Sequence, residues 1–191
     1  MGALQANFIV GIGGSAGSLD GYKALLDTLP SNTGMAFIIV SHLMPTANSE
    51  LAEILSSHTK MPVMVVSTAM LIRRNHVYVI PPDADLLIEH LTFKVVTPRT
   101  MRNKQIDYFL ASLAEAIGAR AIAVILSGYG GDGTEGCKHI KAKGGTTFAQ
   151  DMSAEVPHMS RNAQDSGCID FILPPDKISE KLKKMAAALK T

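Results

Sequence analysis

The chain has 191 residues, a formal net charge of +1 and 18% charged residues. This length fits one domain, and the small net charge excludes the basic footprint of a nucleic-acid-binding protein. The 47% hydrophobic content is enough for a sizeable core. No run of about 18 apolar residues predicts a membrane-spanning helix, and the N-terminus lacks the pattern of a secretory signal. We therefore expect a cytoplasmic globular protein without nucleic-acid binding or membrane insertion.

Metal and disulfide frameworks are not expected. Cys137 and Cys168 have no paired spacing, which argues against both a disulfide scaffold and a zinc site. No histidine is followed at i+3 or i+4 by a second ligand, so we expect no bound metal.

Apolar runs alternate with helical patterns along most of the chain, and several runs lack polar alternation, as in parallel strands covered on both faces. The expected strands are Phe8–Gly11, Ala36–Val40, Pro62–Val66, Val77–Ile80, Ala121–Leu126, Thr146–Ala149 and Ile169–Leu173. Periodic apolar positions predict helices over Leu19–Leu29, Leu51–His58, Ile106–Ile117 and Ile178–Leu189, with another beginning near Thr134. Leu86–Val96 is expected to form an antiparallel hairpin.

These elements predict a three-layer αβα fold with a doubly wound, mostly parallel sheet and one small antiparallel hairpin. Residues 1–7 are expected to be a disordered lead-in, and residues 8–191 a single domain. The second helix is expected to be capped by Asn48 or Ser49. The lysines of the last helix are expected to form a solvated face.

The stretch GIGGSAGS, residues 11–18, is a glycine-rich turn between the first strand and the first helix. Such a turn can cradle a phosphate with backbone N–H groups, or hold Ser15 at a sharp bend as an exposed nucleophile. Ala16 stands where a third Rossmann glycine is expected, and residues 31–35 contain no acidic side chain. The turn also has no lysine. Nucleotide binding at Gly11–Gly17 is therefore the weaker alternative.

Three polar residues are expected at one edge of the sheet. Ser15 follows the first strand, His42 follows the second, and Asp132 follows the strand Ala121–Leu126. In open α/β sheets, ligands bind beyond the carboxyl ends of the strands. A serine, a histidine and an aspartate that meet there are the side chains of a hydrolytic triad, whatever their order in the chain.

Each of the three also has a simpler structural explanation. Ser15 fits a turn or helix-capping serine, His42 a histidine at a strand end, and Asp132 a cap for the helix near Thr134. Their shared position and the glycines around two of them favour the catalytic interpretation, because glycine lets the backbone approach a substrate and offer N–H groups to an oxyanion. His158 falls in a loop near the same edge.

The chain resembles the catalytic domain of the bacterial chemotaxis protein-glutamate methylesterases, most closely the version found in hybrid proteins that also carry a methyltransferase domain. The resemblance runs from about Phe8 to Pro175. Its motifs are IVGIGGSAGSLD, FIIVSHLMPT, LAEILSSHTKMPV, NHVYVIPPDADL, IDYFLASLAEAIGARAIAVILSGYGGDGTEG, GGTTFAQD and DFILPP.

The resemblance implies a serine hydrolase without a cofactor, which demethylates γ-glutamyl methyl esters on the cytoplasmic helices of chemoreceptors or sensor proteins in a phosphorelay signalling system. Some members also deamidate receptor glutamines. By motif, Ser15 is the nucleophile, His42 the general base and acid, and Asp132 the carboxylate that orients it. The oxyanion donors would be the backbone amides of Ala16 and Tyr129.

This chain departs from the family pattern at several positions. The family usually reads G-A-S-A-G-G or G-A-S-T-G-G at the nucleophile, so Gly14 and Ser18 differ, and Tyr129 replaces a methionine or threonine. His158-Met159-Ser160-Arg161 replaces a G-M-P-R/K stretch, which changes the shape of that loop. The receiver domain of stand-alone family members is not among these residues, so the sequence gives no basis for predicting control by phosphorylation within them. A non-catalytic docking module of a larger signalling protein is the alternative function.

Overall fold

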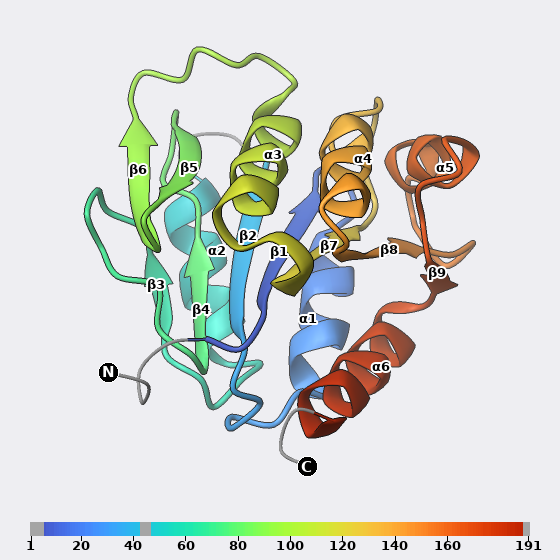
Figure 1. The fold of residues 1–191 in the computed structure, drawn as a ribbon, viewed down its shortest axis with the longest axis horizontal. Coiled ribbons are helices and arrows are strands. Elements are labelled where there is room, and N and C mark those ends of the chain that lie inside the picture. The colour runs from blue at the N-terminus through green and yellow to red at the C-terminus, as the bar shows by residue number, and fades with distance from the viewer. Residues whose placement is uncertain (1–5, 43–46, 189–191) are drawn as a thin grey trace.

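One parallel sheet forms the centre of the molecule. The computed structural model describes residues 6–42 and 47–188, without the side chains of residues 47–49. The sheet has the strand order β3-β4-β2-β1-β7-β8-β9, and neighbouring strands are parallel (Figure 1). Its strands are β1 (Ile9–Gly14), β2 (Ala36–Ser41), β3 (Val63–Val65), β4 (His76–Val79), β7 (Ala121–Ile125), β8 (Thr146–Gln150) and β9 (Phe171–Leu173).

Helices cover both faces of this sheet. They are α1 (Leu19–Asp27), α2 (Ala47–Ser56), α3 (Gln105–Ile117), the short 3₁₀ helix η1 (Gly118–Arg120), α4 (Thr134–Ala142), α5 (His158–Asp165) and α6 (Pro175–Ala188). One buried cluster joins the sheet to α1, α2 and α6, and a second joins it to α3, α4 and α5. The fold is therefore the predicted three-layer arrangement.

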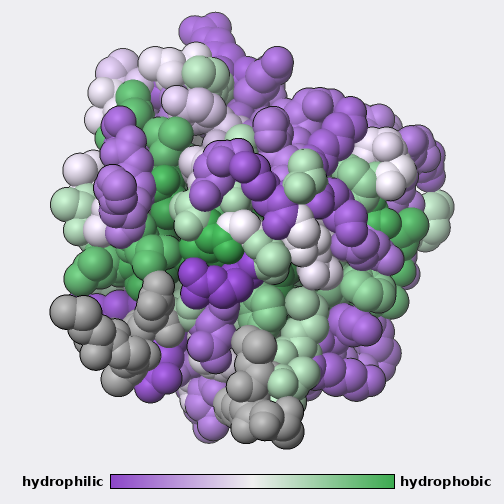
Figure 2. Space-filling view, viewed as in Figure 1, coloured by the Kyte–Doolittle hydropathy of each residue, from purple (hydrophilic) through white to green (hydrophobic). Residues whose placement is uncertain are grey.

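The predicted hairpin is confirmed. Strands β5 (Asp85–Glu89) and β6 (Thr92–Val96) pair antiparallel in a separate two-stranded sheet. Its buried side chains belong to the same cluster as α3. In a space-filling view from the same side, apolar residues are exposed on the left, beside the hairpin (Figure 2).

Several boundaries differ from those expected. β1 continues to Gly14 instead of ending at Gly11, and α5 begins at His158 where a loop was expected. α2 begins at Ala47, so Asn48 and Ser49 lie inside its first turn and neither precedes the helix as its cap. Leu189, the last predicted apolar position of α6, lies outside the described residues.

The segment 1–7 was expected to be a disordered lead-in, but its last two residues are part of the packed domain. Ala6 is buried, and the Asn7 N–H donates to Gly34 O at 2.9 Å. Residues 1–5 lie outside the described part. Within the described residues, no helix combines the length and hydrophobicity that crossing a bilayer requires.

Two glycines of the glycine-rich stretch lie inside β1 and provide room for α3. A Cβ on Gly11 would lie 2.7 Å from Leu110 Cδ2, and one on Gly13 would lie 2.6 Å from Ile106 Cγ2. Both distances are below normal contact, so these glycines permit close packing of α3 on β1. They do not form a loop around a ligand, which removes the structural basis for a phosphate cradle at Gly11 and Gly13.

The direction of chain winding reverses at β1. On one side of β1 the strands lie in the order β2, β4, β3 toward the edge of the sheet. The chain then crosses to the other side of β1, where β7, β8 and β9 follow in order. The carboxyl ends of β2, β1 and β7 therefore flank the topological switch point, where α/β sheets place their ligands. His42 follows β2, Ser15 follows β1, and Asp132 lies in the loop after β7.

Candidate active site

A cleft of about 360 Å³ opens at the switch point. It is lined by Ser15, His42, Asn103, Tyr129, Gly130, Gly131 and Asp132. The structure thus brings together the three residues of the predicted triad and Tyr129. Asn103 was not predicted. It lies just before α3 in the left-handed backbone region, with φ 54°.

His42 and Asp132 are in direct contact. His42 Nε2 lies 2.6 Å from Asp132 Oδ2, and the Asp132 side chain is almost completely buried. An ionised carboxylate only accepts hydrogen bonds, so the hydrogen of a neutral His42 resides on Nε2 and Nδ1 keeps its lone pair. The arrangement therefore fixes the tautomer in which Nδ1 is available as a base.

Asp132 also caps a helix, although a different helix from the one expected. Its Oδ2 accepts from Ile106 N at 3.0 Å and its Oδ1 from Asp107 N at 2.8 Å, both in the first turn of α3. α4, the helix that follows Asp132 in the chain, begins after Gly133 and receives no hydrogen bond from Asp132. The capping explanation is thus wrong for α4. The positive end of the α3 dipole faces the carboxylate and favours its charge.

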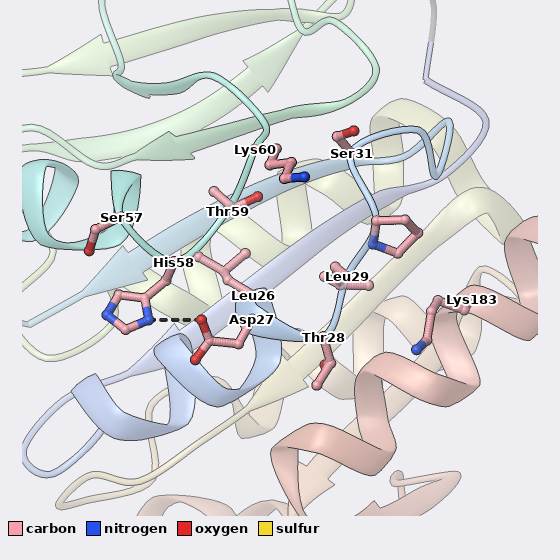
Figure 3. A pocket seen from close by; sticks show the side chains of 11 residues that line it. Leu26, Asp27, Thr28, Leu29, Ser31, Ser57, His58, Thr59, Lys60 and Lys183 are labelled. Atoms are coloured by element: carbon pink, nitrogen blue, oxygen red, sulfur yellow. Dashed lines mark hydrogen bonds and ion pairs between the residues drawn. The ribbon is translucent and has the colours of Figure 1, made fainter.

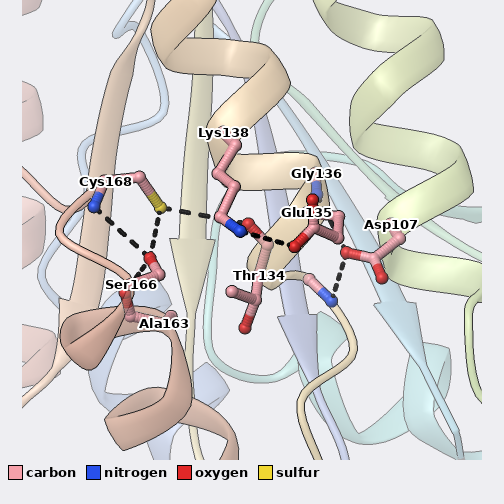
Figure 4. Close-up of polar contacts among 9 residues, drawn as sticks. Asp107, Thr134, Glu135, Gly136, Lys138, Ala163, Ser166 and Cys168 are labelled. Carbon is pink, nitrogen blue, oxygen red and sulfur yellow. Dashed lines mark hydrogen bonds and ion pairs between the residues drawn. The ribbon is translucent and has the colours of Figure 1, made fainter.

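Asp107 makes the reciprocal contact. Its Oδ1 accepts from Gly133 N and Gly136 N, each at 2.8 Å, at the beginning of α4 (Figure 4). The first turn of α3 is therefore held by an aspartate before α4, and the first turn of α4 by an aspartate in α3. Burial raises the pKa of Asp107 above its ordinary value, and the nearby Asp132 adds to this effect.

We expect opposite results from two substitutions at Asp107. Asp107→Asn keeps the oxygen that accepts both glycine amides and removes a buried charge, so the free energy of unfolding at pH 7 should stay level or rise slightly. Asp107→Ala leaves both amides unpaired and should lower the free energy of unfolding by about 2–4 kcal/mol. Urea denaturation of the purified variants measures both. A loss of similar size in the two variants would contradict the role of Oδ1.

The contribution of Asp107 to the stability of the wild-type protein changes with pH in a definite direction. The folded-state pKa of Asp107 lies above its ordinary value of 3.8, so the folded state binds this proton more tightly than the unfolded state. The contribution of Asp107 to stability should therefore increase as pH falls through the raised pKa toward 3.8, and it is lost as pH rises again. Asp107→Asn should remove that component from the stability-against-pH curve.

The turn that carries Ser15 is held by Ser127, which is fully buried two residues after the end of β7. Ser127 O accepts from Ser15 N at 2.8 Å, and Ser127 Oγ donates to Ala16 O at 2.8 Å. The same Oγ accepts from Val156 N at 2.9 Å. One side chain thus joins the turn that carries Ser15 to the segment before α5.

Ser127→Ala should therefore reduce activity by about tenfold through loss of positioning, with a stability cost of about 1–3 kcal/mol for the unpaired Val156 amide. Ser179→Ala is a matched control, because Ser179 is also buried and hydrogen-bonded, but lies in α6 on the far side of the sheet. The control should lose stability without loss of turnover per folded molecule. Equal turnover in both variants would contradict a positioning role for Ser127.

The departures from the family pattern around Ser15 have structural explanations. A Cβ on Gly14 would lie 2.5 Å from the Tyr22 hydroxyl, so Tyr22 in α1 occupies the space that an alanine methyl would need. Ser18 Oγ donates to Ser15 O at 2.6 Å. A Cβ on Gly14 would also lie 2.7 Å from Ser18 Cβ, so the two changed positions pack against each other in the turn.

The predicted oxyanion amides lie on the two loops that border Ser15. Within the described residues, neither Ala16 N nor Tyr129 N donates a hydrogen bond, whereas the adjacent amides of Ser15 and Gly128 donate to Ser127 O and Val156 O. A Cβ on Gly128 would lie 3.0 Å from Ser15 Cβ, which shows how closely the two loops approach. Unpaired N–H groups beside the candidate nucleophile Ser15 are what an oxyanion hole requires.

The loop from Gly128 to Asp132 rests on α5. Met159 N donates to Gly128 O at 2.8 Å, and Asn162 Nδ2 donates to Gly130 O at 2.7 Å. The rings of Tyr129 and His158 are 5.5 Å apart. His158 is therefore close to the site, as expected from its place in the sequence. Two departures from the family pattern, Tyr129 and His158, contact each other.

The Ser15 hydroxyl has no hydrogen-bond partner among the described residues, His42 included. Catalytic hydrogen bonds are often long or misaligned without substrate and tighten in the complex.

Gln105 was missed by sequence reasoning. It is buried at the start of α3, and its side-chain amide lies 3.2 Å from His42 Nε2 and 3.1 Å from Met101 O. No sequence pattern marks it, because its importance depends on the position of α3 beside His42.

A larger groove of about 650 Å³ lies at the opposite end of the sheet and contains none of the predicted site residues. There His58 Nδ1 contacts Asp27 Oδ1 at 2.9 Å (Figure 3). His58 lies two residues beyond Ser56, the last residue of α2, so the helix expected over Leu51–His58 ends earlier than predicted. In the described part of the chain, no group of three potential ligands is arranged to hold a metal ion.

A parallel α/β sheet with a serine and a histidine–carboxylate pair at its switch point is the arrangement of a serine hydrolase. Comparison with known proteins identifies the family within the serine hydrolases. The family model described as CheB methylesterase matches residues 10–182. The chain belongs to the CheB methylesterase family.

Individual relatives agree with this assignment. A Leptospira interrogans protein is 32% identical over 88% of this chain and 90% of its own length, and is provisionally named a protein-glutamate methylesterase/protein-glutamine glutaminase. The Thermotoga maritima protein of that name is 32% identical over 91% of this chain. The chain spans only 53% of that relative. The crystal structure of the Thermotoga maritima CheB methylesterase catalytic domain superimposes with a TM-score of 0.87, at 29% identity, over 94% of this chain and 99% of that one.

Proposed function

We propose that the chain is the catalytic domain of a protein-glutamate methylesterase that releases methanol from γ-glutamyl methyl esters. The observation that carries the proposal is the 2.6 Å contact between His42 Nε2 and Asp132 Oδ2, in the same cleft as Ser15. A serine hydroxyl is a weak nucleophile, and a histidine in the correct tautomer is what activates it.

In the proposed reaction, Ser15 Oγ attacks the ester carbonyl carbon while His42 Nδ1 accepts the hydroxyl proton. The resulting oxyanion receives hydrogen bonds from Ala16 N and Tyr129 N, and Asp132 stabilises the imidazolium. His42 then donates its proton to the departing methoxide, so methanol leaves and an acyl-enzyme remains. Water, activated by His42, hydrolyses the acyl-enzyme to the glutamate carboxylate and free Ser15. The cycle needs no cofactor.

The substrate is expected to be a methylated glutamate on the cytoplasmic helices of a chemoreceptor or related sensor protein, which places the domain in the cytoplasm. Relatives named both methylesterase and protein-glutamine glutaminase support this class, and they suggest glutamine deamidation as a second activity. A 38% identical segment forms 14% of a 104.1 kDa Rhodobacter capsulatus protein. This supports the proposal that such a domain also works beside other domains of a larger signalling protein.

A serine-directed fluorophosphonate probe distinguishes the hydrolase from a non-catalytic docking module. Labelling should occur in the wild type and be lost in a folded His42→Gln variant, because the probe needs an activated serine. Methanol release from membranes that contain a methylated chemoreceptor then tests the substrate class. Absence of labelling in well-folded wild-type protein would favour the docking module, and labelling without methanol release would overturn the substrate assignment.

A further inference from the structure

The side chain of Tyr129 is exposed at the cleft that contains Ser15, and the proposed reaction gives it no role. Among the large apolar and aromatic side chains exposed in the described residues, Tyr129 alone lines this cleft. Its exposed fraction is 63%, and its hydroxyl has no hydrogen-bond partner within the described part of the chain. Only the backbone amide of Tyr129 takes part in the proposed chemistry. The ring is therefore available to contact a substrate.

The loop that carries Tyr129 presents no other exposed side chain to the cleft. Its neighbours in the sequence are Gly128, Gly130 and Gly131, and the Asp132 side chain at the end of the loop is buried. Glycines let a bound chain approach the loop closely, whereas one aromatic ring supplies a large contact area. Selection among substrates by this loop therefore depends on the Tyr129 ring.

The ring is held in position before any substrate binds. The residues before and after Tyr129 are both fixed by α5, since Gly128 O and Gly130 O accept hydrogen bonds from it at 2.8 and 2.7 Å. His158, the first residue of α5, lies against the ring, with the two ring centroids 5.5 Å apart and the planes inclined at 59°. A tyrosine has few rotatable bonds, so a ring supported in this way loses little conformational entropy when it makes a contact.

The proposed chemistry brings the helix of the substrate close to this ring. The carbonyl carbon of a γ-glutamyl ester is three bonds from its own Cα, so the helix lies at the mouth of the cleft when the carbonyl accepts a hydrogen bond from Tyr129 N. A helix with its side chains is about 10 Å across. Residues three and four positions apart share one face of it. The side chain one turn from the methylated glutamate therefore lies beside the Tyr129 ring.

We propose that the Tyr129 ring, supported by His158, selects substrates that carry an aliphatic side chain one helical turn from the methylated glutamate. This inference rests on the proposed methylesterase function, because it places the ester carbonyl at Tyr129 N. An aliphatic side chain against the ring removes apolar surface from water, whereas a polar side chain there loses hydrogen bonds to water without replacement. Tyr129 and His158 both depart from the family pattern, so the preference belongs to this chain.

The test compares two helical peptides that each contain a single γ-glutamyl methyl ester. One peptide has leucine four residues before and four residues after the ester, and the other has glutamine, whose helix propensity is similar. Binding to the full chain with Ser15→Ala, which cannot form the acyl-enzyme, is measured by fluorescence anisotropy. The leucine peptide should bind about tenfold more tightly, as partial burial of an aliphatic side chain predicts. This readout does not depend on hydrolysis.

Further variants in the Ser15→Ala chain test whether the ring is the source of the preference. Tyr129→Ala should bring the ratio of the two Kd values close to one, and Tyr129→Phe, which keeps the ring, should retain it. Tyr108→Ala is the matched control and should leave the ratio unchanged, because Tyr108 is an exposed tyrosine of α3 that does not line the cleft. Equal binding of the two peptides, or a ratio that survives Tyr129→Ala, would overturn the proposal.

Methanol release by the wild-type chain separates this inference from the proposed function. If both peptides released methanol with equal kcat/KM, the methylesterase function would stand and the preference would be wrong. If neither released methanol while the difference in Kd held, the hydrolytic function would be wrong and the contact at Tyr129 would stand.

Discussion

Replacement of Ser15 by alanine is expected to reduce methanol release by about 10⁵–10⁶-fold, which is the scale of nucleophile removal in serine hydrolases. The loss should appear in kcat, because the alanine side chain cannot form the acyl-enzyme. The fold should be unaffected, since the Ser15 hydroxyl has no hydrogen-bond partner among the described residues. Methanol release from methylated receptor membranes measures the effect, and circular dichroism checks the fold.

Ser18→Ala is the matched control for this experiment. Ser18 lies in the same turn and its hydroxyl donates to Ser15 O at 2.6 Å, but it does not line the cleft. Its removal should change turnover by about tenfold at most, consistent with a net contribution near 1 kcal/mol for one hydrogen bond. A Ser15→Ala variant that keeps a tenth of wild-type turnover would rule Ser15 out as the nucleophile.

The Asp132→Asn variant should lose about 10³–10⁴-fold in kcat, in line with the corresponding serine-protease substitution. An asparagine NH₂ beside Nε2 favours the tautomer with hydrogen on Nδ1, and that nitrogen then cannot accept the Ser15 proton. KM should change much less, because the interaction matters mainly in the transition state.

This variant should also lose stability, by about 1–3 kcal/mol. Asp132 accepts from Ile106 N and Asp107 N with its two separate oxygens, whereas asparagine has only one acceptor oxygen. Urea denaturation measures the loss, and kinetics on the folded fraction isolate the chemical effect. Asp107→Asn is the control, since it removes a neighbouring charge but keeps the acceptor of both glycine amides. If Asp132→Asn retained more than a tenth of wild-type turnover, Asp132 would have no part in the mechanism.

The fold could be predicted largely because buried parallel strands leave an unambiguous signal. Unbroken apolar runs such as Ala36–Val40 and Ala121–Leu126 fix the strands of a doubly covered sheet. α5 escaped prediction because its sequence, HMSRNAQD, is polar and buries only a narrow side. β1 extended further than expected because glycines usually end strands, whereas Gly13 is required there for contact with Ile106.

The residues of the candidate site that lie just after strand ends could be predicted from the sequence. Ser15, His42 and Asp132 were placed by topology alone, and the structure brings them to one cleft. Contacts made by helix starts could not be predicted in this way. The link between Asp132 and α3, and the position of Gln105 beside His42, depend on how α3 lies across β1, which no local pattern encodes.

The mutual capping of α3 and α4 has a dynamic consequence. Neither helix can fray at its first turn without releasing a carboxylate that holds the other, so the two beginnings should open together as one cooperative unit. The amides of Ile106, Asp107, Gly133 and Gly136 would then exchange with solvent at a common rate, although they come from segments more than twenty residues apart. The alignment of His42 depends on this unit, and each opening event would briefly misalign the imidazole.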